Sequence, residues 1–227
     1  MFLTLLFSSP LLALAWIIAI LFSLTVHEFS HGLMAKFRGD LTAEREGRLS
    51  LNPLVHLDLF GLIPLLLFGF GWAKPVPFNP YNLKNPKWDS VLIALAGPFM
   101  NLCIATVSAI AFRLLIGGGV IDGTNLLTAF LFFLILLNLF LMFFNIIPIA
   151  PLDGSKLFFA LFDAPKYESL RRFVAIRGPQ ILMIAVLLSL FTNVDIFFFI
   201  SQPAYSVCHA LSGTSCEAYQ SMLFSSI

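Results

Sequence analysis

Four long apolar runs, separated by short polar loops, are the feature that most constrains the fold of this 227-residue chain. The runs cover residues 11–37, 89–116, 125–147 and 179–200, and each reaches the roughly 20 residues that a helix needs to cross a hydrocarbon layer. The composition agrees, because 59% of the residues are hydrophobic and only 11% are charged. The pattern predicts an all-α polytopic membrane protein with about four spanning helices.

A fifth apolar stretch, residues 54–73, is interrupted by Pro64 and several glycines. We predict a re-entrant segment, since irregular backbone at membrane depth is tolerated only where protein or a water-filled cavity covers it. Basic residues support this topology. With a re-entrant segment, the loops 36–53, 74–88 and 152–177 all face the cytoplasm and hold twelve of the thirteen lysines and arginines. Both chain termini are then expected outside.

We assign residues 1–200 to one intramembrane domain and residues 201–227 to a polar C-terminal tail. The apolar start lacks basic residues, so we expect a retained helix rather than a cleaved signal peptide. An outside tail would place Cys208 and Cys216 in an oxidising compartment, where they can form a disulfide; two unpaired cysteines are the alternative. The net charge of +1 argues against a nucleic-acid partner.

The last third of the first run contains the polar motif His27-Glu28-Phe29-Ser30-His31. Histidines four residues apart lie on the same face of a helix, so both imidazoles can bind one metal ion. Glu28 lies close enough to act on a water at that metal, as in zinc hydrolases. Ionisable side chains inside a membrane helix are costly and indicate function. The alternative is a pair of histidines that hydrogen-bond inside a helix bundle.

A catalytic zinc needs three protein ligands and an open position. Asp153 is the candidate for the third ligand. It follows the run 125–147, which also ends on the cytoplasmic side, so it should lie at the same depth as the histidines. The alternative is an aspartate that caps a helix starting near Ser155. The matching depth favours the ligand.

Together these motifs resemble the site-2 protease family of intramembrane zinc metalloproteases. The resemblance covers roughly residues 15–165 and rests on three elements in the family's order. The matching residues are His27, Glu28 and His31; Gly97, Pro98 and Asn101; and Asn145, Pro148, Leu152, Asp153 and Gly154. The chain looks like a compact bacterial type without a PDZ or CBS domain.

The resemblance implies one zinc ion per chain, held by His27, His31 and Asp153, with Glu28 as the catalytic acid and base. It implies a membrane-protein substrate whose transmembrane segment is hydrolysed within the lipid bilayer, as in regulated intramembrane proteolysis. It also implies a bacterial inner membrane. The placement of the basic residues puts the active site near the cytoplasmic face.

Asn101 and Asn145 are candidates for an amide that shares the oxyanion charge of the reaction. The alternative for each is a hydrogen bond between helices; we leave it open for Asn101 and favour substrate binding for Asn145. Residues Gly69, Phe70 and Gly71 resemble the family's re-entrant β-loop, whose edge could bind an extended substrate by strand addition. The alternative is a structural plug.

His56 and Asp58, in the segment before the re-entrant bend, are interpreted as structural, with outer contacts to the metal ligands as the alternative. A metal-binding membrane protein without peptidase activity, either a transporter or an inactive relative, is the alternative function. A transporter would be expected to show repeated halves, which we do not find. An inactive relative would lack Glu28 or a ligand.

Overall fold

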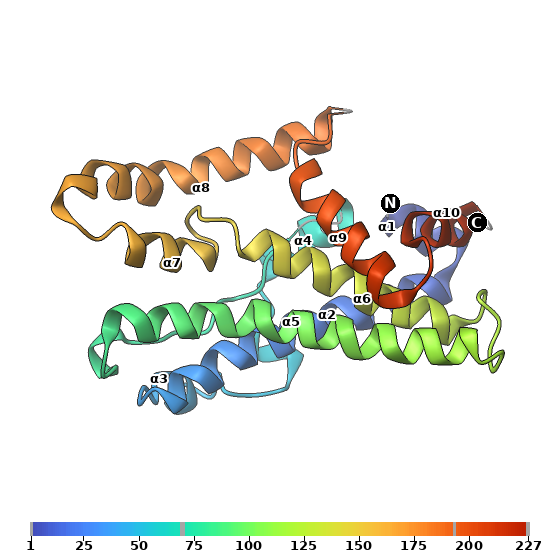
Figure 1. Ribbon diagram of the computed structural model, residues 1–227, viewed down its shortest axis with the longest axis horizontal. Coiled ribbons are helices and arrows are strands. Elements are labelled where there is room, and N and C mark those ends of the chain that lie inside the picture. The colour runs from blue at the N-terminus through green and yellow to red at the C-terminus, as the bar shows by residue number, and fades with distance from the viewer. Residues whose placement is uncertain (1, 69–70, 193, 226–227) are drawn as a thin grey trace.

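The computed structural model of the chain describes all residues except 1, 69–70, 193 and 226–227 (Figure 1). Four helices in this part are long and apolar enough to cross a membrane. They are α2 (Pro10–Phe37), α5 (Pro86–Gly117), α6 (Leu126–Asn145) and α8 (Glu168–Phe191). The protein is therefore an integral membrane protein, and the prediction of an all-α polytopic fold is confirmed.

Shorter helices connect and flank these four. They are α1 (Phe2–Ser8), α3 (Thr42–Arg45), α4 (Leu59–Phe68), α7 (Gly154–Leu161), α9 (Phe198–Ser212) and α10 (Cys216–Ser225), with single 3-10 turns at Pro53–Val55, Pro80–Asn82 and Pro165–Tyr167. No β-strand occurs in the described residues.

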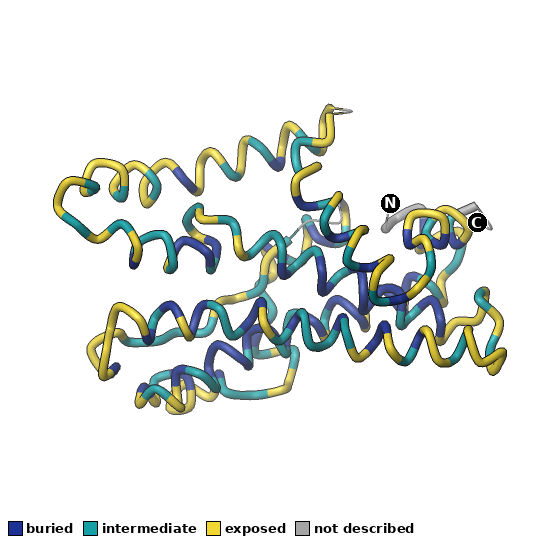
Figure 2. The backbone as a smooth tube through the Cα atoms, viewed as in Figure 1, coloured by how far each residue is buried: buried dark blue, intermediate teal, exposed yellow. Residues whose placement is uncertain are grey.

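Helices α2, α5 and α6 pack against one another and form the core of the molecule (Figure 2). Small residues line their contacts, which lets the backbones approach closely, as is usual for helices in membranes. The alanines that are completely buried in this core are Ala13, Ala19, Ala105, Ala109 and Ala129. Side-chain caps define where two of the helices begin: Asn85 accepts from the Trp88 N–H, and Asn125 accepts from the Leu127 N–H.

Helix α8 differs from the prediction of a span at 179–200. It begins about ten residues earlier and ends at Phe191. Pro179, at the start of the predicted span, lies inside α8, although proline breaks most helices. The helix stops just before the polar residues Thr192 and Asp195. Only 11% of its most apolar 18-residue stretch is buried. Figure 2 shows that α8 lies away from the core and is exposed along most of its length.

The segment 54–73 bends back on itself, as predicted for a re-entrant segment. Its ends lie together, since the Lys74 N–H donates to the His56 carbonyl over 2.8 Å. The backbone at Gly71 lies against the backbone at Gly61, and a Cβ on Gly71 would be 2.2 Å from the Gly61 oxygen. The expected β-loop is not seen as a strand: Gly69 and Phe70 lie outside the described residues, and residues 71–79 have no regular structure.

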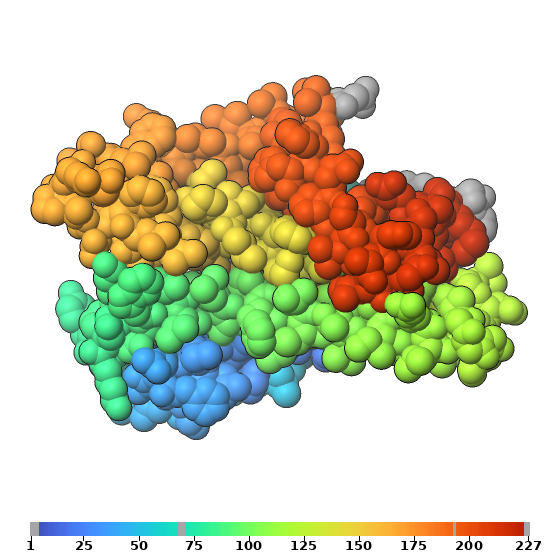
Figure 3. All heavy atoms as spheres, viewed as in Figure 1, coloured from blue at the N-terminus to red at the C-terminus, as the bar shows by residue number. Residues whose placement is uncertain are grey.

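The C-terminal residues, which the sequence analysis assigned to a polar tail, form the helices α9 and α10. Helix α9 packs on α6 and α5, and α10 packs on α9. Figure 3 shows these residues, in red, covering part of the α5 and α6 surface. A disulfide joins Cys208 in α9 to Cys216 in α10, so the expected pairing of the two cysteines is confirmed. The Tyr219 hydroxyl donates to the Gly123 carbonyl and ties α10 to the loop between α5 and α6.

Candidate metal centre

His27 and His31 lie one turn apart on the buried face of α2. Their Nε2 atoms are 3.0 Å apart, and their rings meet edge to face with centroids 4.6 Å apart. Both residues are at most 9% exposed. The helical spacing of the motif thus places the two imidazole nitrogens close enough to bind one metal ion.

The Asp153 carboxylate faces the two histidine Nε2 atoms from the chain segment that follows α6. Its Oδ2 atom lies 3.3 Å from His27 Nε2 and 3.4 Å from His31 Nε2. The chain doubles back after α6, and only glycine fits at position 154, because a Cβ there would be 2.0 Å from the Ile146 oxygen. Asp153 occupies the N-cap position of α7, yet its side chain makes no capping bond. Its carboxylate faces the histidines instead.

Each histidine is oriented by a buried acceptor at its other ring nitrogen. His27 Nδ1 lies 2.6 Å from Asn101 Oδ1, and His31 Nδ1 lies 2.7 Å from the Ile93 carbonyl oxygen. A carbonyl oxygen can only accept, so we assign the proton to Nδ1 in each ring. Both Nε2 atoms then present lone pairs towards each other and towards Asp153.

The donor set fits a zinc ion. Three electron-pair donors face one another at 3.0 to 3.4 Å, and nothing in the described residues donates a hydrogen bond to the buried Asp153 Oδ2. Such an arrangement is repulsive without a cation between the atoms. Tetrahedral zinc with ligands at about 2.0–2.2 Å requires ligand atoms about 3.3–3.6 Å apart. Among the described residues, this is the group that could hold a metal through three such side chains.

Asn101 belongs to a buried polar chain that links three helices. Its Nδ2 donates to Asn138 Oδ1 over 2.7 Å, and Asn138 Nδ2 donates to Ser23 Oγ over 2.7 Å. All three side chains are completely buried. The amide of Asn101 is thus committed to His27 and to a neighbouring helix. Asn138 and Ser23 were not among the predicted site residues, although an asparagine in the middle of the apolar run 125–147 is a detectable signal.

Glu28 is also held by the backbone of a distant segment. Its Oε2 accepts a hydrogen bond from the Val76 N–H over 2.9 Å, and the residue is 9% exposed. Asp153 is the most open of the proposed ligands, with 21% of its side chain exposed. The site is therefore closed around Glu28 and opens beside Asp153.

Asn145, the last residue of α6, is half-buried, and its Nδ2 donates to the Leu141 carbonyl over 2.9 Å. The amide nitrogen has a second hydrogen that this bond does not use.

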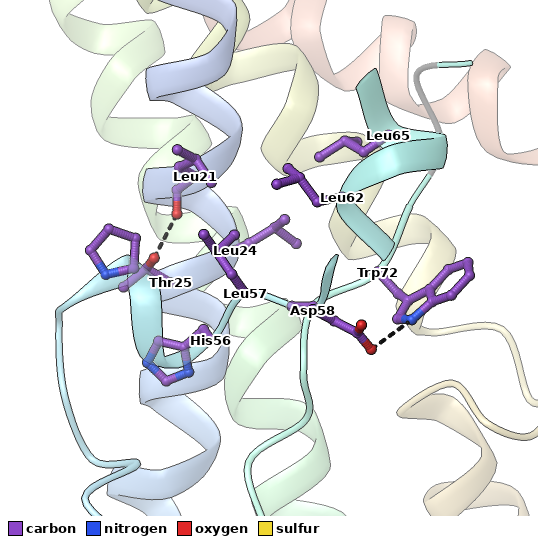
Figure 4. Close-up of a pocket in the computed structure, with 11 residues that line it drawn as sticks. Leu21, Leu24, Thr25, His56, Leu57, Asp58, Leu62, Leu65 and Trp72 are labelled. Atoms are coloured by element: carbon purple, nitrogen blue, oxygen red, sulfur yellow. Dashed lines mark hydrogen bonds between the residues drawn. The ribbon is translucent and has the colours of Figure 1, made fainter. Parts of the chain in front are cut away.

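His56 and Asp58 lie apart from the three ligand atoms, beside a small cavity next to α2 (Figure 4). His56 Nε2 donates to the Ser50 carbonyl, and Asp58 accepts from the Trp72 indole over 3.1 Å. These contacts are consistent with the structural interpretation.

The fold and the site together define a class: a multi-pass membrane protein with a zinc-metalloprotease motif inside its first long helix. The chain belongs to peptidase family M50, which it matches over residues 15–125 and 119–191. The resemblance to the site-2 protease family is thereby confirmed.

Three relatives carry zinc-metalloprotease names. "Putative zinc metalloprotease YwhC" of Bacillus subtilis is 40% identical over 144 residues, which are 62% of this chain and 66% of the relative. "Putative zinc metalloprotease Rip2" of Mycobacterium tuberculosis is 32% identical over 141 residues, 59% of this chain and 52% of the relative. Its namesake in Mycolicibacterium smegmatis is 34% identical over 92 residues, 38% of this chain and 35% of the relative.

The chain thus matches less than two thirds of the length of these relatives. No solved structure matches it significantly.

Proposed function

We propose that the protein is an intramembrane zinc endopeptidase that hydrolyses peptide bonds within or near the transmembrane segments of other proteins. The observation that carries this proposal is the convergence of His27 Nε2, His31 Nε2 and Asp153 Oδ2 at an apolar span, in which the buried Glu28 directly follows His27. Membership of peptidase family M50 supports peptides as the substrate class. The apolar surroundings of the site favour a substrate that lies in the bilayer.

His27, His31 and Asp153 would hold one zinc ion per chain. When bound, zinc lowers the pKa of a water towards neutrality and polarises a carbonyl. Asn101 keeps His27 in the tautomer that presents Nε2, and the Ile93 carbonyl does the same for His31. These outer contacts also fix the ring orientations, so the ligand set is ready before the metal arrives.

Glu28 would accept the proton of the attacking water and later deliver it to the leaving amine. Its contact with Val76 holds one carboxylate oxygen and leaves Oε1 for proton transfer. The site opens beside Asp153, and Asn145 could donate its second amide hydrogen to the substrate there. The segment Gly69-Phe70-Gly71 stays our candidate for pairing with an extended substrate.

We propose an orientation in the membrane that the arrangement of the loops supports. Figure 1 shows α3, the start of α5 and the turn between α7 and α8 at one end of the molecule, and both termini at the other. The first end carries the basic loops, which favours a cytoplasmic site. The Cys208–Cys216 disulfide supports an outside location for the C-terminus. A bacterial inner membrane fits both features.

The test is to purify the parent protein and the Glu28→Gln variant and to measure the zinc bound to each. Both proteins are then incubated with a substrate protein that has one transmembrane helix, and cleavage is measured. We expect about one zinc per chain in both, with cleavage by the parent alone. Asp153→Ala should lose zinc, whereas His56→Ala, a buried histidine outside the ligand group, should keep it. If the parent binds zinc but cleaves none of several such substrates, the proposed peptidase activity is contradicted.

A further inference from the structure

Residues 74–77, Lys74-Pro75-Val76-Pro77, form a strap that lies across the acidic side chain of the site. The Val76 N–H donates to Glu28 Oε2 over 2.9 Å. Prolines have no N–H group, so Val76 provides the single peptide donor between positions 75 and 77. The Val76 side chain rests on α2 one turn further on, where a Cβ added to Gly32 would be 3.3 Å from Val76 Cγ1.

The loop before the re-entrant bend holds the strap at two points. Arg48 Nη2 donates to the Lys74 carbonyl over 2.7 Å and to the Pro75 carbonyl over 3.3 Å. The Lys74 N–H donates to the His56 carbonyl over 2.8 Å. The His56 ring is 2% exposed and donates to the Ser50 carbonyl, which braces the same loop. The strap is therefore fixed on the side facing away from Glu28.

Arg48 is unusual because it is a buried cation without an anionic partner. It is 8% exposed, its Nε lacks a hydrogen-bond partner, and it forms none of the ion pairs of the described residues. Burying such a charge is costly unless strong polar contacts offset the cost. Among the described residues, the two strap carbonyls accept the hydrogen bonds of the Arg48 side chain, so the burial of this side chain is tied to the position of the strap.

We propose that Arg48 is a positioning residue for the catalytic carboxylate. By fixing the carbonyls of Lys74 and Pro75, it keeps the Val76 N–H directed at Glu28 Oε2. Without this anchor the strap would move, and Glu28 would sample rotamers in which neither oxygen faces the reacting water. This inference rests on the proposed function.

The experiment compares Arg48→Gln and Arg48→Lys with Arg45→Gln. Arg45 lies in α3, three residues before Arg48, and its side chain is exposed. Arg45→Gln is therefore the matched control, because it removes the same charge from the same loop without disturbing the strap. For Arg48→Gln we expect about a tenfold lower kcat, with KM and zinc affinity within about twofold of the parent. Arg48→Lys should recover part of kcat, because an ammonium can still reach one carbonyl. Arg45→Gln should match the parent.

A second variant tests whether Arg48 acts through the strap. Val76→Pro removes the N–H that reaches Glu28, and we expect a similar loss of kcat at parent levels of bound zinc. The double variant Arg48→Gln/Val76→Pro should be no slower than either single variant, because both remove the same contact. If the two losses multiply, Arg48 does not act through Val76 and the inference is overturned.

The outcomes also separate this inference from the proposed function. A parent that binds zinc and cleaves nothing overturns the proposed function. An active parent with an equally active Arg48→Gln variant overturns the role of Arg48 alone. A merely structural Arg48 would lower zinc affinity and thermal stability in step with kcat, and that result also contradicts positioning.

Discussion

Gly97 of α5 lies against His31 of α2 so closely that a Cβ atom on Gly97 would be 2.5 Å from His31 Nε2. The same atom would be 2.6 Å from His27 Cε1. Both contacts are with the ends of the rings that face Asp153. Position 97 therefore has to be glycine because the metal-binding ends of the histidines occupy the space where a side chain would start.

Gly97→Ala should weaken zinc binding at least tenfold, since the new methyl group pushes the two Nε2 atoms away from Asp153. The measurement is zinc affinity by competition with a chelator. Gly117→Ala is the matched control in the same helix, because a Cβ at Gly117 meets nothing within 4 Å. Equal zinc affinity in the two variants would contradict the proposed ligand geometry.

The sequence predicted the parts of the site that depend on helical periodicity and on charge. The four-residue spacing placed His27 and His31 together, and the charge map put Asp153 at the same depth. The backbone partners of His31 and Glu28 could not be predicted. Ile93 offers a backbone carbonyl and Val76 a backbone N–H, groups that every non-proline residue carries, so no residue type in the sequence marks them.

The errors in the fold have similar physical causes. Pro179 is a helix breaker in water, but it is tolerated inside α8, where other groups can satisfy the freed carbonyl. The C-terminal residues were predicted only as a polar tail, without helices. Their buried side chains, such as Ala204 and Cys208, recur at i and i+4 on one face of α9, a pattern that a count of polar residues does not reveal.

Asn138→Leu should lower zinc affinity about 10- to 100-fold, the effect typical of lost outer contacts to a metal ligand. The substitution leaves Asn101 Nδ2 without its buried acceptor, so Asn101 is free to turn away from His27. Chelator competition again measures the change. Thr106→Val in α5 is the control, because in the described part of the chain the Thr106 hydroxyl donates to the Leu102 carbonyl of its own helix. Zinc affinity unchanged by Asn138→Leu would mean that Asn101 holds His27 unaided.

Asp40, in the loop after α2, should make stability depend on pH. Burial raises the pKa of Asp40, but hydrogen bonds from Asn82 Nδ2, Thr42 Oγ1 and the Asn79 N–H outweigh it and hold the pKa below its usual value. A carboxylate with a lowered pKa stabilises the folded state above its unfolded pKa, about 3.9, and this stability is lost as the pH falls through the folded pKa.

Asp40→Asn should therefore lower the free energy of unfolding by about 1 to 2 kcal/mol at pH 7. The gap between the parent and the variant should shrink as the pH falls below about 4. Chemical unfolding of both proteins in detergent from pH 7 to pH 3 measures it. A gap that stays constant with pH would show that the charge of Asp40 is not what binds the loop.

The disulfide should stabilise the end of the molecule that lies away from the metal centre. Replacing both Cys208 and Cys216 by serine removes the link between α9 and α10. A closed loop of this length contributes about 2–3 kcal/mol. The thermal midpoint should therefore fall, and reduction of the parent should reproduce the fall. Zinc affinity should not change, because the side-chain polar contacts of His27, His31 and Asp153 in the described part of the chain are with one another, Asn101 and Ile93.

Cys103→Ser is the matched control, since Cys103 is a half-buried free thiol in α5. It makes the same chemical change without opening a disulfide, and it should leave the thermal midpoint near that of the parent. A loss of zinc affinity in the Cys208→Ser/Cys216→Ser variant would contradict this assignment, because it would mean that the C-terminal helices support the metal ligands through the packing of α9 on α6.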